Sequence, residues 1–309
     1  MEPLVTILVP VYNGAEFLRA TLDSLLKQSD PRFEVLCLDD GSTDHSAEII
    51  RNIPDPRIRL LQHPNRGLCE TINRGISETK TPFVARNDQD DLSVPHRLEK
   101  QLAYALEHPD VDCAFSHYQK TGRSRMWQNL DKQTPSPGNA ATFRGLPDGC
   151  QLASTMFART EVLRAVGGFR QSYYPADDWD LQLRLVERFQ VRILLEPLVI
   201  YRFHLGANTY RLFALMQLKG RWAEDSHRRR TQGLPEQSFE QFSHLDRGTR
   251  SHRLRRALRE FAALQLRMAG QHLLDGQNLR AYARGLLSFA SNPAEILHRF
   301  RRIKAHRNG

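Results

Sequence analysis

The spacing of apolar residues changes repeatedly along the first part of the chain. Short apolar runs of the kind found in buried strands occur at Val5–Val11, Phe33–Leu38, Arg57–Leu61 and Pro82–Ala85. Stretches with apolar residues at helical spacing lie between them, at Phe17–Leu26, Ser46–Arg51 and Leu68–Ser77. This alternation predicts βαβ units and therefore a parallel sheet with helices packed on it.

The pattern continues less regularly toward the C-terminus. We expect helices at about 95–107, 160–165 and 178–189, and strands at 111–116, 153–158, 191–195 and 199–204. A polar stretch rich in glycine and proline, 120–149, is long for a connection and is expected to contribute to specificity. Beyond residue 204 the pattern is helical, with a break at 231–243 and a hairpin at 253–303 that turns at Gly276.

Composition excludes several classes of protein. Apolar residues make up 40% and charged residues 26% of the 309 residues, which supports a packed core and not a disordered chain. No apolar run is long enough for a helix that crosses a bilayer, and the N-terminal residues do not resemble a signal peptide. The four cysteines lack CxxC spacing, so we expect neither disulfides nor structural zinc, and a reducing cytoplasm fits best.

The net charge of +9 is distributed unevenly. Residues 205–309 contain 20 Lys or Arg and 8 Asp or Glu, a balance of +12, whereas residues 1–204 have a balance of −3. A basic C-terminal part suits a polyanionic partner, either nucleic acid or an anionic membrane surface. A solvated helical surface, or a contact between copies of the chain, accounts for the same arginines, and composition does not decide between these readings.

Chemistry-bearing residues follow the predicted strands. Tyr12 and Asn13 follow the first strand, Asp39 and Asp40 end the second, and residues 86–91 follow the fourth. Ligands of open parallel sheets bind beyond the carboxyl ends of the strands. We therefore expect an aromatic ring and two acidic clusters to meet along one edge of the sheet.

Asp88, Asp90 and Asp91 form the sharpest of these clusters. Three carboxylates within four residues repel one another, and a magnesium or manganese ion would neutralise them and bind a phosphorylated substrate. The alternative is a solvated acidic turn before the helix that begins near Pro95.

The remaining candidates have similar alternatives. Asp39 could accept a hydrogen bond from a nucleobase on which Tyr12 stacks, or it could belong to an Asx turn. Asp177 and Asp178 could provide a general base, or they could cap a helix. His204 ends a predicted strand and could be structural or bind a metal or phosphate.

Together these motifs resemble the family 2 glycosyltransferases with the GT-A fold. The resemblance covers about residues 4–208 and rests on the order of Pro10–Asn13, Asp39–Ser42, Asn65–Gly67, Ala85–Gln101, Gly167–Phe169, Asp177–Leu181 and Tyr201–His204. It implies a Rossmann-like, mostly parallel sheet flanked by helices over 1–208, followed by a basic all-α region over 209–309. It also implies an enzyme that transfers a sugar, with inversion, from a UDP- or GDP-linked donor to a hydroxyl of a glycan or lipid-linked saccharide in surface polysaccharide synthesis.

The resemblance also implies roles for individual residues. Asp178 aligns with the general base, and Asp177 stands where the family commonly has Glu, which leaves open which of the two acts. A Mn²⁺ or Mg²⁺ ion would be held by the DxD pair Asp88 and Asp90, with Asp91 and His204 as further candidates. The residues implied to bind the nucleotide sugar are Pro10, Tyr12, Asn13, Asp39, Asp40, Asn65, Arg66, Gly67, Arg86, Asp88 and Gly168.

Two other functions are compatible with parts of this pattern. A sugar-nucleotide nucleotidyltransferase would need a glycine-rich phosphate loop after the first strand, and Pro10–Gly14 suits that poorly. A non-catalytic carbohydrate- or nucleic-acid-binding protein would not require Asp88, Asp90 and Asp178 to be intact. We therefore expect a cytoplasmic transferase and no nucleic-acid partner. The basic helices could hold the enzyme at the inner face of the membrane. The oligomeric state is left open.

Overall fold

The computed structural model describes residues 2–121, 140–145, 149–204, 207–246 and 248–292. Its contacts divide the chain into two compact units. The first contains residues 1–120, 129–202 and 223–236, and the second contains residues 121–128, 203–222 and 237–309. The domain boundary expected between 208 and 209 stays a prediction. Of the loop expected at 120–149, residues 122–139 and 146–148 lie outside the described residues.

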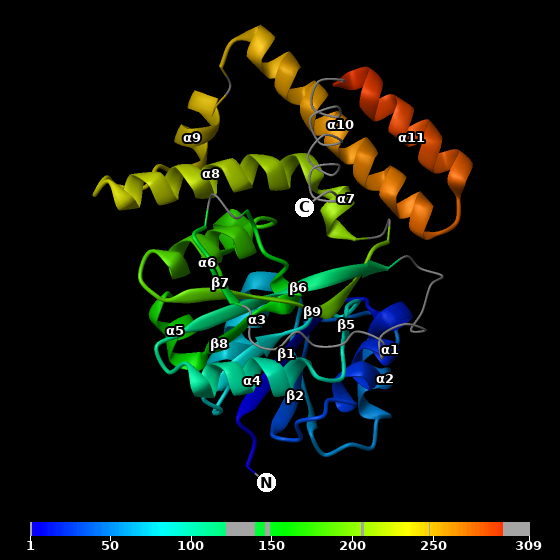
Figure 1. Ribbon diagram of the computed structural model, residues 1–309, viewed down its shortest axis with the longest axis vertical. Helices are drawn as coiled ribbons and strands as arrows, with labels where there is room; N and C mark the ends of the chain where they lie inside the picture. Colours follow the sequence, from blue (N-terminus) through cyan, green and yellow to red (C-terminus); the bar gives the residue numbers. More distant parts are fainter. Residues whose placement is uncertain (1, 122–139, 146–148, 205–206, 247, 293–309) are drawn as a thin grey trace. The chain divides into compact units, whose positions relative to one another are not determined.

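The first unit is built on a nine-stranded sheet in the order β3-β2-β1-β4-β8-β6-β9-β5, with β7 paired to β9 (Figure 1). Strands β1 to β4 pair in parallel, whereas β5 and β7 pair antiparallel to β9, and β8 pairs antiparallel to β4 and β6. The strands are β1 (Val5–Val11), β2 (Phe33–Asp39), β3 (Ile58–Gln62), β4 (Phe83–Arg86), β5 (Leu92–Ser93), β6 (Cys113–Thr121), β7 (Ala140–Thr142), β8 (Phe157–Arg159) and β9 (Val191–Arg202).

Helices cover this sheet on both faces because its parallel strands are buried on both sides. The helices of the first unit are α1 (Ala15–Leu26), α2 (Ser46–Arg51), α3 (Leu68–Glu78), α4 (Arg97–Glu107), α5 (Thr160–Ala165) and α6 (Asp177–Val186). Ile7 and Val9 of β1 pack in one cluster with α1, α2 and α4. Leu8 faces the opposite side, where Gly75 lets α3 approach so closely that an added Cβ would lie 3.0 Å from Leu8. The predicted α/β sheet with flanking helices is confirmed.

Two predicted elements differ from the structure. The strands expected at 191–195 and 199–204 form one continuous strand, β9, which runs through Pro197 and Leu198. Residues 153–155 form the 3₁₀ turn η3 (Ala153–Thr155), and only Phe157–Arg159 pairs as a strand. In both cases pairing with neighbouring strands decides the boundary, and periodicity along the chain does not show that pairing.

The described residues of the second unit are mostly helical. This unit contains α7 (Asn208–Arg211), the start of α8 (Phe213–Thr231), α9 (Phe239–Asp246), α10 (Arg250–Leu274) and α11 (Asn278–Ser291). The expected turn at Gly276, where φ is +75°, joins α10 to α11 as predicted. Of the hairpin expected at 253–303, residues 293–303 lie outside the described residues. Ser288 of α11 donates a hydrogen bond to the carbonyl oxygen of Ala262 in α10 at 2.7 Å. Among the described residues, no helix is both long enough and apolar enough to cross a bilayer.

Candidate active site

The loops that follow β1 and β4 are tied together by one side chain. The amide of Gln89 accepts a hydrogen bond from the backbone N–H of Tyr12 at 2.9 Å and donates one to its carbonyl oxygen at 3.1 Å. Pro10 is buried within β1, whereas Tyr12 is 49% exposed. The predicted meeting of these strand ends is thus present, and the exposed ring of Tyr12 is available for stacking on a base.

The loop after β2 is fixed to the same edge of the sheet. Asn13, at a positive φ of 48°, receives a hydrogen bond on its side-chain oxygen from the backbone N–H of Thr43 at 2.8 Å. Its own backbone N–H donates to the hydroxyl of Ser42 at 2.9 Å. Asn13 therefore positions the loop after β2 through Ser42 and Thr43. Its predicted contact with the nucleotide sugar stays a prediction.

Asp39 and Asp40 use their carboxylates within the protein. Asp39 accepts hydrogen bonds from the backbone N–H of Ser42 at 3.0 Å and from the side chain of Gln62 at 2.8 Å. Asp40 accepts from the backbone N–H groups of Arg66 and Gly67 at 2.7 and 3.0 Å. The turn interpretation therefore holds for these atoms. Each oxygen has a second lone pair, so a contact of Asp39 with a base stays a prediction.

The Asn65–Gly67 segment is shaped by Asp40 in this way. Asn65 and Arg66 are exposed, and Arg66 pairs with Glu70 at 2.8 Å on the helix surface. Their predicted contacts with a nucleotide sugar are compatible with this exposure and remain predictions.

The acidic loop that follows β4 separates its three carboxylates. Asp91 is buried, and its two oxygens accept hydrogen bonds from the hydroxyl of Ser154 at 2.5 Å and the backbone N–H of Arg202 at 3.0 Å. Burial, and then the charges of Asp90 and Asp88, raise the pKa of Asp91 well above its usual value. Asp88 and Asp90 are only partly buried. Asp91 thus joins the loop to η3 and β9, and it is the weakest of the three as a metal ligand.

Three buried arginines bring positive charge to the acidic loop. Arg86 donates from Nε to Asp88 at 2.8 Å. Arg97 is fully buried and interacts electrostatically with Asp91 and Asp88. Arg202 is also buried and interacts electrostatically with Asp90 and Asp91. Long side chains from β4, α4 and β9 thus reach the loop from inside the protein and compensate part of its negative charge, and a divalent cation at the outer carboxylates stays a prediction.

A metal could still bind at the outer part of this loop. Within the described residues, no group of three or more His, Cys, Asp or Glu side chains is arranged to hold a metal ion. Asp88, Asp90 and Asp91 belong to the first unit and His204 to the second, so a metal site that includes His204 stays a prediction. Magnesium commonly takes only one or two protein carboxylates and completes its shell with water and phosphate oxygens. Asp88 and Asp90 fit that smaller requirement.

A second carboxylate pair begins α6. Asp177 is buried, whereas Asp178 is only partly so and accepts a hydrogen bond from the backbone N–H of Trp179 at 2.8 Å. Burial, followed by the neighbouring charge of Asp177, raises the pKa of Asp178 to about 7. A carboxylate of this pKa can accept a proton efficiently near neutral pH. Asp178 is therefore the better placed of the two to act as a base.

Arg86 lies between the two carboxylate clusters. Its positive charge opposes the rise in the pKa of Asp177 and Asp178 that burial causes, and its guanidinium forms an ion pair with Asp88. The guanidinium stacks over the ring of Phe169, 5.2 Å from the ring centre. Its Nη1 is buried and has no hydrogen-bond partner among the residues that the structure describes. One side chain thus links the loop after β4 with the start of α6, and it keeps one unused donor.

The start of α6 is held by an ion network. Arg184 donates to the carbonyl oxygen of Gly168 at 2.6 Å and pairs with Asp180 at 2.9 Å. Asp180 also pairs with Arg170. A Cβ on Gly168 would lie 2.2 Å from the side-chain oxygen of Asn73, so this glycine permits close packing against α3. Gly168 thus has a packing role in this structure, and its predicted contact with the donor stays a prediction.

Sequence reasoning missed several residues of this site. Gln89, Ser154, Arg97 and Arg202 hold the acidic loop, and the thiols of Cys69 and Cys150 contact Asp177 and Asp178 respectively. Arg97 and Gln89 lie inside the motif that suggested the family, which was a usable signal. Nothing in the spacing of Ser154 or the cysteines pointed to these contacts, because they depend on the antiparallel half of the sheet and on α3 and the segment before η3.

Comparison with known proteins decides the family. The family model described as "Glycosyl transferase family 2" matches residues 6–166. The chain belongs to glycosyl transferase family 2. EpsE of Bacillus subtilis (strain 168), named as a glycosyltransferase, is 31% identical over 199 residues, which cover 60% of this chain and 67% of EpsE. Hyaluronan synthase of Pasteurella multocida is 27% identical over 254 residues, 79% of this chain but only 25% of that protein.

Solved structures show which fold the chain has. TarS of S. aureus in complex with UDP-GlcNAc has a TM-score of 0.58 and 17% identity, and the match covers 94% of this chain and 89% of that one. The mannosyltransferase PcManGT from Pyrobaculum calidifontis, in complex with GDP-Man and Mn²⁺, has a TM-score of 0.51 and 20% identity, with coverage of 99% and 81%. The fold of this glycosyltransferase is therefore of the GT-A type.

Proposed function

We propose that this glycosyltransferase moves a sugar from a nucleotide-diphosphate sugar to a hydroxyl acceptor with inversion. The observation that carries the proposal is the convergence of Asp88 and the Asp177–Asp178 pair on Arg86. A donor phosphate at the outer acidic loop and an acceptor at Asp178 would then lie on opposite sides of one reaction centre. The related TarS and PcManGT structures, which hold UDP-GlcNAc and GDP-Man, support a donor of this class.

Asp178 is the base in this proposal. Its carboxylate removes the proton of the acceptor hydroxyl while the hydroxyl oxygen forms a bond to the anomeric carbon of the donor. The bond from that carbon to the diphosphate oxygen breaks in the same displacement, and the nucleoside diphosphate leaves with the electron pair. One displacement inverts the anomeric centre, so no covalent nucleophile is needed.

Arg86 and the buried arginines prepare the site for this charge movement. The ion pair with Arg86 fixes Asp88, and the unused Nη1 of Arg86 can donate to an oxygen of the donor. A divalent cation, when bound by Asp88 and Asp90, would supply Lewis-acid stabilisation of the departing diphosphate. The Mn²⁺ of PcManGT supports manganese or magnesium in this role.

Transfer assays with donor binding measured separately test the proposal. Donors linked to UDP and GDP are screened for turnover with and without Mn²⁺ or Mg²⁺, and the best donor is used with Asp178→Asn. We expect this variant to bind the donor as the unchanged protein does and to lose transfer. Equal turnover of both proteins rejects the base assignment, and absence of turnover and of donor binding for every nucleotide rejects the transferase proposal.

The acceptor and the location are finer parts of the same proposal. The names of relatives such as the Bacillus subtilis TuaG, for teichuronic acid biosynthesis, and hyaluronan synthase support a glycan or lipid-linked saccharide acceptor in surface polysaccharide synthesis. All four cysteines are unpaired thiols, which supports a reducing, cytoplasmic environment. Growth of product size on defined oligosaccharide acceptors is the measurement that identifies the acceptor.

A further inference from the structure

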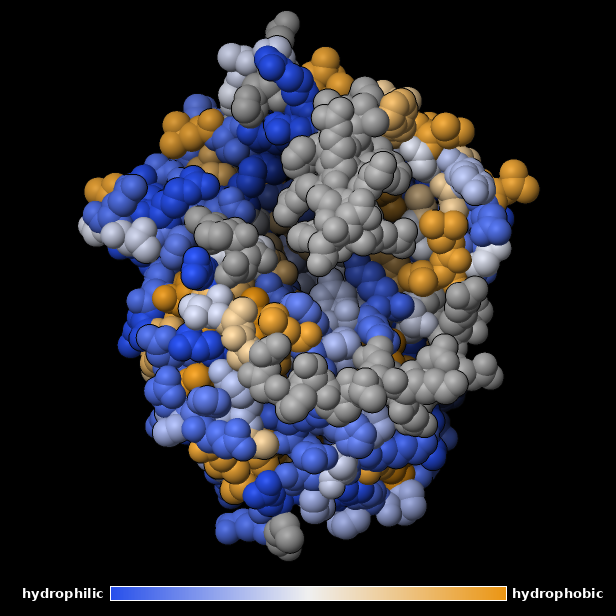
Figure 2. Space-filling view, viewed as in Figure 1, coloured by the Kyte–Doolittle hydropathy of each residue, from blue (hydrophilic) through white to orange (hydrophobic). Residues whose placement is uncertain are grey.

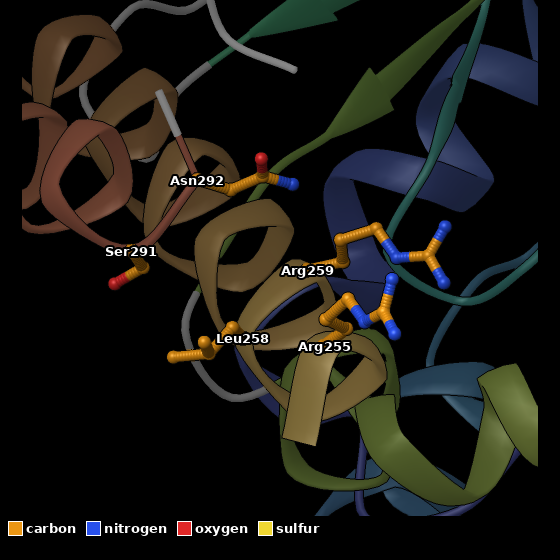
Figure 3. A pocket seen from close by; sticks show the side chains of 5 residues that line it. All are labelled: Arg255, Leu258, Arg259, Ser291 and Asn292. Carbon is orange, nitrogen blue, oxygen red and sulfur yellow. The ribbon is translucent and has the colours of Figure 1, made fainter. Parts of the chain in front are cut away.

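The pocket of the second unit carries no acidic side chain. It is lined by Arg255, Leu258, Arg259, Ser291 and Asn292, and its two arginine side chains extend in the same direction (Figure 3). Apolar and hydrophilic residues lie intermixed over the part of the view in which Figure 1 draws α10 and α11 (Figure 2). This pocket therefore supplies no second base, and the groups that can adjust proton removal are the neighbours of Asp178 in the first unit.

Gln182 shares one side of α6 with the proposed base. Asp178 and Gln182 are four residues apart, so their side chains are neighbours on the helix surface. Gln182 is only 1% exposed, and its amide uses both ends on the backbone of Gln151. Its Nε2 donates to the carbonyl oxygen of Gln151 at 2.8 Å, and its Oε1 accepts from the backbone N–H of Gln151 at 2.8 Å. Two hydrogen bonds thus hold the segment before η3 on α6, one turn beyond the base.

This attachment brings Cys150 to the base. Cys150 precedes Gln151 in the chain, and its thiol contacts the carboxylate of Asp178. The sulfur also lies 3.5 Å from the carbonyl oxygen of Gln151, but a carboxylate is the stronger acceptor for its single proton. A thiol beside a carboxylate keeps its proton at neutral pH. Asp178 therefore has two donors, this thiol and the backbone N–H of Trp179.

The same segment reaches the acidic loop at its other end. Ser154 is fully buried, and its hydroxyl accepts a hydrogen bond from the backbone N–H of Asp88 at 3.0 Å and donates one to Asp91 at 2.5 Å. Residues 150–154 thus contact the base at one end and the loop expected to face the donor at the other. Loss of the contacts of Gln182 would release the first end and leave the second end in place.

A thiol suits a base that must keep its proton affinity. The charges of Asp177, Arg86 and Asp88 also act on Asp178. Hydrogen bonds to a carboxylate favour its charged form and so lower its pKa, and a thiol is a weaker donor than a hydroxyl. The Cys150 thiol can therefore orient the carboxylate with little loss of basicity.

We propose that Gln182 is a positioning residue of the transfer reaction, which holds the Cys150 thiol on the Asp178 carboxylate through the backbone of Gln151. The proposal rests on the proposed function of Asp178 as the base. Gln182 acts through the segment that it holds and not on the reacting atoms. A base that is oriented before the acceptor arrives needs no ordering during proton transfer, and a misplacement of about 1 Å can cost roughly 10²-fold in rate.

A double-mutant cycle on the full chain tests this proposal. Gln182→Leu removes both hydrogen bonds to Gln151 and should lower kcat about tenfold. The donor Kd should change less than about twofold, because Ser154 still holds the acidic loop. Cys150→Ala should lower kcat by a similar factor, and the double variant should lose little more, because both changes remove the same contact. Losses that multiply in the double variant overturn the proposal, as does an unchanged kcat in Gln182→Leu.

The variant Cys150→Ser gives a readout that does not depend on how Gln182→Leu folds. A hydroxyl keeps a donor at this position, so kcat should stay within about threefold of the unchanged protein. Because the hydroxyl donates more strongly, the midpoint of the kcat/KM profile should move to lower pH. A merely structural role of the segment predicts no such movement, and a profile identical to that of the unchanged protein overturns the proposal.

Gln28 is the matched control, because it holds backbone in the same way. Its Nε2 donates to the carbonyl oxygen of Val94 at 2.7 Å, its Oε1 accepts from the backbone N–H of Leu98 at 2.9 Å, and it is 7% exposed. Gln28→Leu should lower the urea midpoint about as much as Gln182→Leu and leave kcat as it is. Equal loss of kcat in both variants would assign the effect to stability and overturn the proposal.

Asp178→Asn separates this proposal from the proposed function. Full turnover of Asp178→Asn means that the base assignment itself fails. Lost turnover of Asp178→Asn together with full turnover of Gln182→Leu overturns the positioning role alone.

Discussion

The two units of this glycosyltransferase use arginine in opposite ways. In the first unit Arg86, Arg97 and Arg202 are buried and lie against the carboxylates of the acidic loop. In the second unit Arg255 and Arg259 are exposed beside apolar side chains. Burying a charge requires compensating partners, whereas an exposed charge is stabilised by water and remains available to an external anion. The location of an arginine, more than the net charge of its region, therefore indicates what it binds.

The largest expected effect concerns Asp178, a carboxylate that interacts with the buried Arg86. Asp178→Asn should lower kcat by about 10²–10⁴-fold, since it removes the group that accepts the proton. Donor affinity, measured by calorimetry, should change less than about twofold, because the amide keeps the shape of the carboxyl group. Asp23→Asn, an exposed carboxylate on α1, is the matched control and should keep full turnover.

The second prediction tests the contrast between buried and exposed arginine directly. Arg97 donates to Asn87, Ser93, Gln101 and the carbonyl oxygen of Arg86. Arg97→Met should lower the free energy of unfolding by roughly 3–5 kcal/mol, because buried acceptors and the Asp91 charge lose their partner. Arg259→Met should change it by less than about 0.5 kcal/mol. Urea denaturation measures both, and equal stability of the two variants would contradict the comparison.

The third prediction uses the pKa of about 7 for Asp178. As this base must be unprotonated, kcat/KM should rise about tenfold from pH 6 to pH 8 and then level off. Stability changes in the opposite direction. Because the folded protein raises this pKa, the stabilisation is complete below about pH 4 and is lost as pH rises through 7. Urea midpoints at pH 5 and 8 check this, and the difference should be smaller in Asp178→Asn.

The smallest effect should come from Gln89, which joins the loops after β1 and β4. Gln89→Ala removes two hydrogen bonds to the backbone of Tyr12, each worth about 0.5–1.5 kcal/mol. We expect the donor Kd to rise about three- to tenfold with kcat little changed, because the ring of Tyr12 is held less firmly. An unchanged Kd would show that Tyr12 does not contribute to donor binding. Gln232→Ala, at the end of α8, is the control.

The sequence predicted the parallel half of the sheet well. Val5–Val11 and Phe33–Asp39 are continuous buried strands, and their partners are close in sequence through short helices. The antiparallel half was less accurate because β8 and β9 pair with strands far away along the chain. For the candidate site, too, the parallel half was the predictable part. Tyr12, Asp39 and Asp88 lie at strand ends that the βαβ pattern places together.

By itself the sequence determined the family and the edge of the sheet at which the candidate residues meet, because these follow from local spacing and motif order. The tertiary structure alone decided what each charge faces. It buried Asp91 beneath Ser154 and Arg202, placed Arg86 beside two carboxylate clusters and left Leu279 and Leu286 of α11 exposed. Burial and charge pairing depend on residues far apart in the chain, so no local pattern contains them.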